Sequence, residues 1–453
     1  MRTTPTPTDH TAERRRARNS VIYGSAGTVV EWFDYGLYLY LVPVMAPLFF
    51  PSTDPVVSAM ASLGVFAAGS IMRILGGAFY GRIGDRFGRK RALVASILLM
   101  TIPLALTAFL PTYSAVGIWA PVLFTLMRLA QGFSAGGEYS GTIVQLVEQA
   151  PAKRRGFLAS TAVFTSGVGI LLSSLLVSVM TTWLSPAAMS SYGWRIGYLV
   201  GGLLGLWALV MRRRMSETVA FEAEEKQGTV PSHPIRYALH HLPRPVFVAA
   251  LLSGYGGILY YTVLGFVPTI LDSMTELQSD QALWVTTGMT IAYAFVTPAF
   301  GMLSDSWGRR RALIWAAIGF LVLSVPMFVL LTNEGLGVVI AAGLVLLVLL
   351  MLYTGPVVAL IGELFPSKAR YSALAVGYNL GSAVLGGTAP LIAAVTIHLF
   401  HTPVAPAYYL VGCSVIAVIL LPRLRETKGI TLAEMDEIGE TTPVSAVSPP
   451  NHG

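Results

Sequence analysis

Six ionisable residues lie inside long apolar runs of this chain, where a charge is costly. Three are acids and three are arginines, namely Glu31, Asp34, Arg73, Arg128, Glu138 and Arg195. An ionisable side chain in an apolar segment that crosses a bilayer faces the protein interior or a water-filled cavity, and it marks a functional site by default. We therefore expect these residues to carry the chemistry of the protein.

The two signs of charge predict two different tasks. Arginine stays protonated and its planar guanidinium matches a carboxylate, so Arg73 and Arg128 are predicted to hold an anionic ligand. A carboxylate that is partly removed from water binds and releases a proton nearer neutral pH. The coupling proton is therefore assigned, in order of preference, to Asp34, Glu31 and Glu138. Static ion pairing between helices is the alternative for all of them.

Helical periodicity places several of these side chains on common stripes. One stripe, within an arc of about 60° at 100° per residue, contains Glu31, Asp34 and Tyr38. A second, within about 80°, contains Arg128, Gln131, Ala135 and Glu138. A single polar stripe on an apolar helix is typical of a face that lines a cavity, so Tyr38 and Gln131 join the predicted ligand contacts. Arg195 lies at the outer end of an apolar run and is expected at the cavity mouth or in a structural role.

About twelve apolar segments must position these residues. The chain of 453 residues is 54% hydrophobic and 12% charged, whereas soluble domains carry roughly 25% charged residues. Runs of about 20 apolar residues span a bilayer, and uninterrupted runs predict helices rather than barrel strands. The expected spans are 21–46, 58–80, 92–110, 117–147, 157–181, 194–211, 246–271, 282–303, 312–331, 336–362, 371–398 and 406–422.

The basic residues follow an alternating distribution along the chain. All but three of the 30 Lys and Arg fall in the N-terminal segment, in every second loop and in the C-terminal tail. Because cytoplasmic loops of membrane proteins are enriched in Lys and Arg, this predicts twelve spans with both termini in the cytoplasm. The net charge of +7 therefore needs no nucleic-acid partner. The single cysteine and the scattered histidines predict neither an intrachain disulfide nor a metal site.

The chain divides into two halves that share sequence. The expected parts are an N-terminal segment (1–20), a six-helix bundle (21–211), a central loop (212–245), a second six-helix bundle (246–422) and a tail (423–453). The pattern of Gly81–Leu93 recurs at Gly301–Leu313, and that of Glu148–Arg155 recurs at Glu363–Arg370. Parallel six-helix repeats are an architecture of secondary transporters, with the substrate site near mid-membrane.

The first repeated pattern resembles the signature loop of the major facilitator superfamily. The resemblance rests on Gly81, Asp85, Arg86, Gly88 and Arg89, with counterparts at Asp305, Gly308 and Arg309. It implies a cytoplasmic gate that holds the outward-open state. Physically, an aspartate can cap the N-terminus of a neighbouring helix while it is paired with an arginine. Simple topogenic charge is the alternative.

A narrower resemblance covers nearly the whole chain. The motifs are Gly27–Tyr35, Met72–Gly77, Arg128–Tyr139, Gly193–Ile196 and Arg425–Gly429. Together they resemble the metabolite:proton symporters, the group that includes permeases for α-ketoglutarate, citrate, shikimate and proline/betaine. Ile74 and Gly197 depart from that family, which usually has proline at both positions. These departures leave the pocket geometry, and hence the substrate, open.

The second half offers tyrosine and amide side chains instead of mid-membrane charges. Tyr260, Tyr261 and Asn379 are predicted to contact a small metabolite by hydroxyl, ring and amide. Tyrosines near helix ends are equally ordinary anchors at the membrane interface.

These observations predict an all-α transporter of the bacterial inner membrane, monomeric, multi-pass and in contact with lipid, which is not an enzyme and has no cofactor. We expect it to import a small organic anion, a carboxylate metabolite, together with protons by alternating access. One alternative is proton symport of a zwitterionic compatible solute of the proline/betaine type. Less favoured alternatives are a drug exporter and a non-transporting membrane sensor.

Overall fold

Helices make up the described part of the chain, and no strand occurs within it. The computed structural model describes residues 7–53, 55–227, 232–267, 270–271, 279–332 and 335–441. The remaining parts of the predicted N-terminal segment, central loop and tail (1–6, 228–231 and 442–453) lie outside the described residues. The prediction of an all-α fold is confirmed.

The chain forms two compact units. Unit 1 comprises Met1–Gln149 and Thr165–Ile235, and unit 2 comprises Ala150–Phe164 and Arg236–Gly453. The long helix α6 (Arg155–Trp183) therefore begins in unit 2 and ends in unit 1. The other boundary between the units lies between Ile235 and Arg236, inside the predicted central loop.

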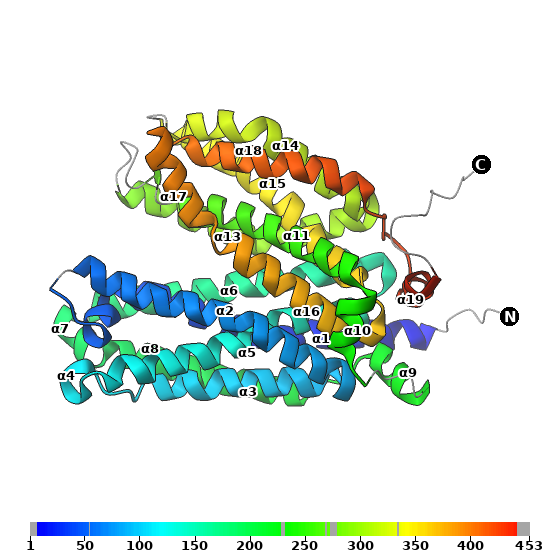
Figure 1. Cartoon of the computed structure of the whole chain (residues 1–453), viewed down its shortest axis with the longest axis horizontal. Helices are drawn as coiled ribbons and strands as arrows, with labels where there is room; N and C mark the ends of the chain where they lie inside the picture. The colour runs from blue at the N-terminus through cyan, green and yellow to red at the C-terminus, as the bar shows by residue number, and fades with distance from the viewer. Residues whose placement is uncertain are drawn as a thin grey trace. The chain divides into compact units, whose positions relative to one another are not determined.

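Unit 1 is a bundle of long helices joined by short connections. Its helices are α1 (Pro7–Phe49), α2 (Pro55–Phe87), α3 (Arg89–Thr107), α4 (Tyr113–Val116), α5 (Trp119–Gln149), α7 (Pro186–Ala188), α8 (Trp194–Arg213) and α9 (Val219–Gln227), with most of α6. A π-helical turn, η2 (Met189–Gly193), precedes α8. Helix α5 packs against α1, α2 and α3, and α3 packs against α8 (Figure 1). Helix α5 thus lies where side chains from several helices meet.

Unit 2 repeats this arrangement with the later helices. They are α10 (Pro234–His241), α11 (Pro243–Tyr260), α13 (Ser279–Trp307), α14 (Arg309–Leu331), α15 (Leu336–Glu363), α16 (Arg370–Gly381), α17 (Ala389–Phe400), α18 (Ala405–Leu420) and α19 (Leu432–Thr441). Helix α14 packs against α15 and α18, and α11 packs against α16. Two π-helical segments, η3 (Tyr261–Phe266) and η5 (Ser382–Gly386), extend α11 and α16.

Nine helical segments of the described part are long and apolar enough to cross a membrane by length and composition. They are Met60–Phe87, Arg89–Thr107, Ala152–Trp183, Pro186–Arg213, Pro243–Gly265, Arg309–Leu331, Leu336–Glu363, Ser367–Phe400 and Ala405–Arg423. The count of twelve spans and the cytoplasmic position of both termini stay predictions.

Several predicted boundaries differ from those in the structure. Helix α1 begins at Pro7 rather than at residue 21, because residues 8–20 contain no proline or glycine that would interrupt a helix. The predicted central loop contains α9 and α10, and the predicted tail contains α19. Segments that are too polar to cross a bilayer still form short helices here.

Candidate functional site

The predicted coupling acid Asp34 forms an ion pair with Arg128. Nη1 of Arg128 lies 2.8 Å from Oδ1 of Asp34, and the two side chains are only 3% and 1% exposed respectively. The same Nη1 donates a hydrogen bond to Oε1 of Gln131. The guanidinium also lies 4.1 Å from the ring centroid of Tyr38, within the range of a cation–π contact. The structure therefore brings four of the predicted residues together in unit 1.

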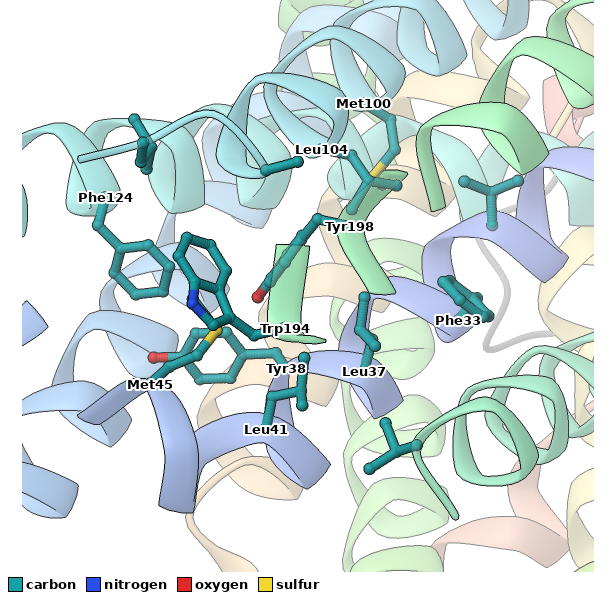
Figure 2. Packing of buried hydrophobic residues seen from close by; sticks show 14 of the residues in the cluster. Phe33, Leu37, Tyr38, Leu41, Met45, Met100, Leu104, Phe124, Trp194 and Tyr198 are labelled. Atoms are coloured by element: carbon teal, nitrogen blue, oxygen red, sulfur yellow. The ribbon is translucent and has the colours of Figure 1, made fainter. Parts of the chain in front are cut away.

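Tyr38 is fixed by contacts on several sides. Its hydroxyl donates to the carbonyl oxygen of Ser62 over 2.6 Å. Its ring stacks on Phe66 and Phe124 at centroid distances of 5.4 and 5.8 Å. Figure 2 shows Tyr38, Phe124 and Trp194 gathered in the buried cluster of unit 1. The Tyr38 ring, which the guanidinium of Arg128 contacts, is thus part of the hydrophobic core.

A second ion pair joins α1 to α2. Nη2 of Arg73 lies 3.0 Å from Oε1 of Glu31, which is fully buried, whereas Arg73 is 11% exposed. Nη1 of Arg73 donates a hydrogen bond of 2.9 Å to the hydroxyl of Tyr35. Both predicted anion-binding arginines are therefore neutralised by acids of α1.

Glycine explains how Arg73 comes so close to α5. A Cβ atom at Gly136 of α5 would overlap the carbonyl oxygen of Arg73, and one at Gly132 would overlap that of Gly69. Helices α2 and α5 pack at backbone distance only because these positions lack side chains. The glycine-rich stretch of α5 thus lies against the backbone of α2 at Gly69 and Arg73.

Glu138 pairs with an arginine that the sequence analysis had placed in a loop. Arg212 lies in the last turn of α8, is fully buried and contacts the carboxylate of Glu138. Ser96 donates a hydrogen bond of 2.7 Å to Glu138, and Arg212 donates one of 3.1 Å to Thr142. The predicted boundary at residue 211 is therefore wrong. Helical spacing was the available signal, because Arg212 lies four and seven residues beyond the buried Ala208 and Gly205.

Arg195 binds the backbone just after the end of α3. Its Nη1 donates to the carbonyl oxygens of Ala108 and Leu110 over 2.7 and 2.9 Å. These carbonyls follow the last residue of α3, where backbone acceptors lack partners within the helix. The guanidinium also lies 4.3 Å from the ring centroid of Trp194. Arg195 therefore closes the end of α3.

The predicted substrate residues of unit 2 are two tyrosines of one aromatic group and a buried amide. The ring centroids of Tyr260 and Tyr261 are 5.3 Å apart, and those of Tyr260 and Tyr293 are 5.5 Å apart. Asn379 is buried and donates from Nδ2 to the carbonyl oxygen of Ala375 over 2.8 Å. Tyr261 begins the π-helical segment η3, and such segments often occur at functional sites.

The predicted gate residues of unit 1 converge on Arg89. Its guanidinium lies 3.0 Å from Glu148 and 3.5 Å from Asp85, and all three side chains are buried. Gly88 has φ 103°, a left-handed conformation that favours glycine. Glu217 accepts the backbone N–H of Arg89 at 2.9 Å. Burial raises the pKa of the Glu217 carboxyl above its ordinary value. The remaining gate residues differ in exposure, since Gly81 is buried and Arg86 is exposed.

The gate residues of unit 2 repeat this geometry. Gly308 has φ 106°, and the guanidinium of Arg309 lies 2.8 Å from Asp305 and 3.5 Å from Glu363. Glu426 accepts the backbone N–H of Arg309 at 2.9 Å, as Glu217 does for Arg89. The Glu217 and Glu426 caps were missed by the sequence analysis, although both acids precede a threonine after the last helix of their half.

Asp305 makes both contacts that were expected of a gate aspartate. Besides its pairing with Arg309, it accepts the backbone N–H groups of Gly156 and Phe157 at 2.8 and 2.9 Å. These residues form the first turn of α6, where negative charge is stabilised by the helix dipole. Arg155, which precedes them, lies 3.0 Å from Glu363. The start of α6 is thus held within unit 2.

Comparisons with known proteins identify the family. The family model described as Major Facilitator Superfamily matches residues 24–278, and the one described as Sugar (and other) transporter matches residues 232–438. The chain belongs to the major facilitator superfamily. In agreement, the solved structure of the proton:xylose symporter XylE aligns with a TM-score of 0.78 at 18% identity, over 94% of this chain and 99% of that one. The human organic anion transporter MFSD10 aligns with a TM-score of 0.66 at 16% identity, over 89% and 99%. These structural likenesses show the shared fold.

Curated relatives within the superfamily are transporters of small solutes. The chain is 33% identical over 441 residues to the proline/betaine transporter of Salmonella typhimurium (strain LT2), covering 93% of this chain and 87% of the relative. It is 32% identical over 436 residues to the glycine betaine/proline/ectoine/pipecolic acid transporter OusA of Dickeya dadantii, with the same coverage. This chain is therefore a major facilitator transporter of the bacterial inner membrane rather than an enzyme. The relatives' names favour the zwitterion alternative over the predicted carboxylate substrate.

Proposed function

We propose that this transporter is a proton symporter that imports a zwitterionic compatible solute of the proline/betaine type. The names of the relatives support this substrate class. The proposal replaces the organic anion that the arginines had suggested when they were considered without their partners.

The observation that carries the proposal is the charge balance of unit 1. The anion prediction assigned Arg73 and Arg128 to an anionic ligand, with ion pairing as the alternative, and in the structure each is paired with an acid of α1. Glu138 and Arg212 form a third pair. A solute that carries one positive and one negative group can exchange partners with such a pair and adds no net charge of its own. A dicarboxylate or tricarboxylate would add negative charge that these pairs do not balance, and uncompensated charge is costly away from water.

Asp34 is proposed as the carrier of the coupling proton. It is buried and bonded to Arg128, so protonation of its carboxylate weakens the ion pair. Arg128 is then able to contact the solute carboxylate, with Gln131 and Tyr38 at its sides. Loss of the proton restores the pair and favours release. Glu31 and Glu138 stay as secondary candidates for the proton.

The other predicted site residues keep proposed roles. We assign Arg73 to the solute carboxylate, and Tyr260, Tyr261 and Asn379 to contacts made by unit 2. The two Gly–Arg turns, with Asp85 and Asp305, are proposed to act in gating on the cytoplasmic side.

Uptake into proteoliposomes with an imposed pH gradient tests the proposed function. Labelled proline and glycine betaine are compared with α-ketoglutarate, citrate and shikimate. We expect gradient-dependent accumulation of the zwitterions and little accumulation of the carboxylates. Accumulation of a carboxylate without accumulation of either zwitterion would favour the predicted organic-anion substrate instead. Accumulation of a zwitterion that is unaffected by a protonophore would contradict proton coupling.

A further inference from the structure

A group of aromatic rings beside the Glu31–Arg73 pair has no role in the mechanism so far. Trp32 and Tyr35 lie on α1, one and four residues after Glu31 of the ion pair. Their ring centroids are 6.0 Å apart and their planes meet at 89°. Tyr139 of α5 lies 6.3 Å from Trp32 at an interplanar angle of 71°. Trp32 thus contacts both tyrosines, and each tyrosine ring lies at a steep angle to the Trp32 ring.

These rings are held in place by packing. The planes of Tyr35 and Phe66 meet at 69°, with ring centroids 5.5 Å apart. A Cβ atom at Gly169 of α6 would come within 3.0 Å of the Cβ of Trp32, so α6 supports the base of this side chain. A rigid aromatic wall needs no reordering when a ligand arrives, which favours binding.

Trp32 and Tyr35 are only partly buried, in contrast to the other aromatic cluster of unit 1. Tyr38 is 1% exposed, and its ring already contacts Arg128, Phe66 and Phe124. That cluster supports the Asp34–Arg128 pair. Of the two clusters, the one that includes Trp32 and Tyr35 is the less completely buried.

The charge beside the rings suits a cation. Glu31 is fully buried, one residue before Trp32 and four before Tyr35. Its carboxylate faces Arg73, which also donates a hydrogen bond to the Tyr35 hydroxyl and lies 5.5 Å from the centroid of the Tyr35 ring. The aromatic group of unit 2 has no such acid on its helix, because Pro243–Phe266 contains neither Asp nor Glu. A ligand cation is therefore better placed in unit 1.

We infer that Trp32, with Tyr35 and Tyr139 as side walls, forms the subsite for the quaternary ammonium group of the solute. This inference rests on the proposed function and assigns the orientation of the solute within the same site. The methylated ammonium lies against the Trp32 face, and Glu31 supplies the negative charge nearby. The solute carboxylate points to Arg73, which shares it with Arg128 in the proposed function. A betaine suits this arrangement because its two charges are separated by a single methylene carbon, while Glu31 and Arg73 are adjacent.

The two types of zwitterion depend on the rings to different degrees. A quaternary ammonium has no N–H group, so a cation–π contact and a nearby anion are its main sources of affinity. The ammonium of proline has two N–H groups and can also donate hydrogen bonds. Loss of the Trp32 ring is therefore expected to weaken betaine binding more than proline binding.

The experiment measures KM for glycine betaine and for proline in wild type, Trp32→Leu and Trp32→Phe. Trp183→Leu is the matched control, because Trp183 is 84% exposed at the end of α6. We expect Trp32→Leu to raise the betaine KM about tenfold, and the proline KM by about twofold or less. Trp32→Phe retains a weaker ring and should raise the betaine KM by about threefold. The control should leave both values near those of the wild type.

The ratio of the two KM values decides the inference. An equal change in KM for both solutes, or an unchanged KM in both Trp32→Leu and Trp32→Phe, overturns the ammonium subsite. The proposed function stands in either case. If Trp32→Leu does not accumulate in membranes, the ratio of the betaine KM to the proline KM in Trp32→Phe tests the inference instead. A wild type that accumulates neither solute overturns the proposed function itself, and the subsite with it.

Discussion

Asp34 of α1 and Arg128 of α5 are joined by a 2.8 Å ion pair in the interior of unit 1. The two residues are 94 positions apart in the chain. Their pairing depends on the close approach of α1 and α5 and couples an acid that can be protonated to a cation that cannot. This relationship is the basis of the first prediction.

Asp34→Asn removes the ionisable group but keeps an oxygen that can accept a hydrogen bond from Arg128. We expect accumulation driven by the pH gradient to fall at least tenfold, whereas exchange of internal for external solute continues. Exchange and net uptake are measured in the same proteoliposome preparation. Gradient-driven accumulation at the wild-type level would remove Asp34 from the proton pathway.

Arg212→Ala leaves Glu138 buried without its cation. Removing one partner of a buried pair costs about 3–5 kcal/mol, so we expect a large loss of folded protein and a lower thermal midpoint in detergent. Arg213→Ala is the matched control, because Arg213 is the next residue of α8 and is exposed. Equal stability of the two variants would show that the Glu138–Arg212 pair does not support the bundle.

Gly88→Ala forces a side chain into the left-handed backbone region and toward the carboxylate of Glu217. We expect a loss of about 1–2 kcal/mol from the backbone alone, and more if Glu217 is displaced from the start of α3. The contrasting variant is Gly64→Ala, since a Cβ there meets nothing within 4 Å and alanine is about 1 kcal/mol better than glycine inside a helix. Unfolding in detergent reports both changes, which should have opposite signs.

Glu217→Gln is predicted to change the pH dependence of stability. Burial raises the pKa of the Glu217 carboxyl, even though backbone N–H groups of Thr218, Lys90 and Arg89 favour its charged form. The folded state therefore binds this proton more tightly than the unfolded state. Its contribution to the free energy of unfolding is greatest at low pH and falls as pH rises from the ordinary value of about 4.3 through the raised value.

The glutamine variant lacks this titration. Relative to the wild type, its thermal midpoint should therefore rise as the pH is taken from about 4 to about 8. Glu222→Gln serves as the control, because Glu222 is exposed on the neighbouring helix α9. A difference between wild type and Glu217→Gln that is constant over this range would contradict the shifted pKa.

The amino-acid sequence alone is enough to predict the helical membrane fold, two related halves and the candidate site residues. The length of an apolar run and the Lys and Arg content of a loop are properties of single segments. They can therefore be recognised without knowing which helices are neighbours. The stripes that contain Asp34 and Arg128 could be recognised for the same reason, because helical periodicity is local.

Which charged side chains meet depends on how the helices pack, so it could not be predicted from the sequence. Arg212 directly follows an apolar run, which is typical of an arginine in a cytoplasmic loop. The packing of α8 nevertheless places it beside Glu138. Arg73 and Arg128 suggested an anionic ligand because their partners on α1 are distant in sequence. The substrate class depends on the net charge of the assembled site. That charge is a sum over helices brought together by packing, and no single segment contains it.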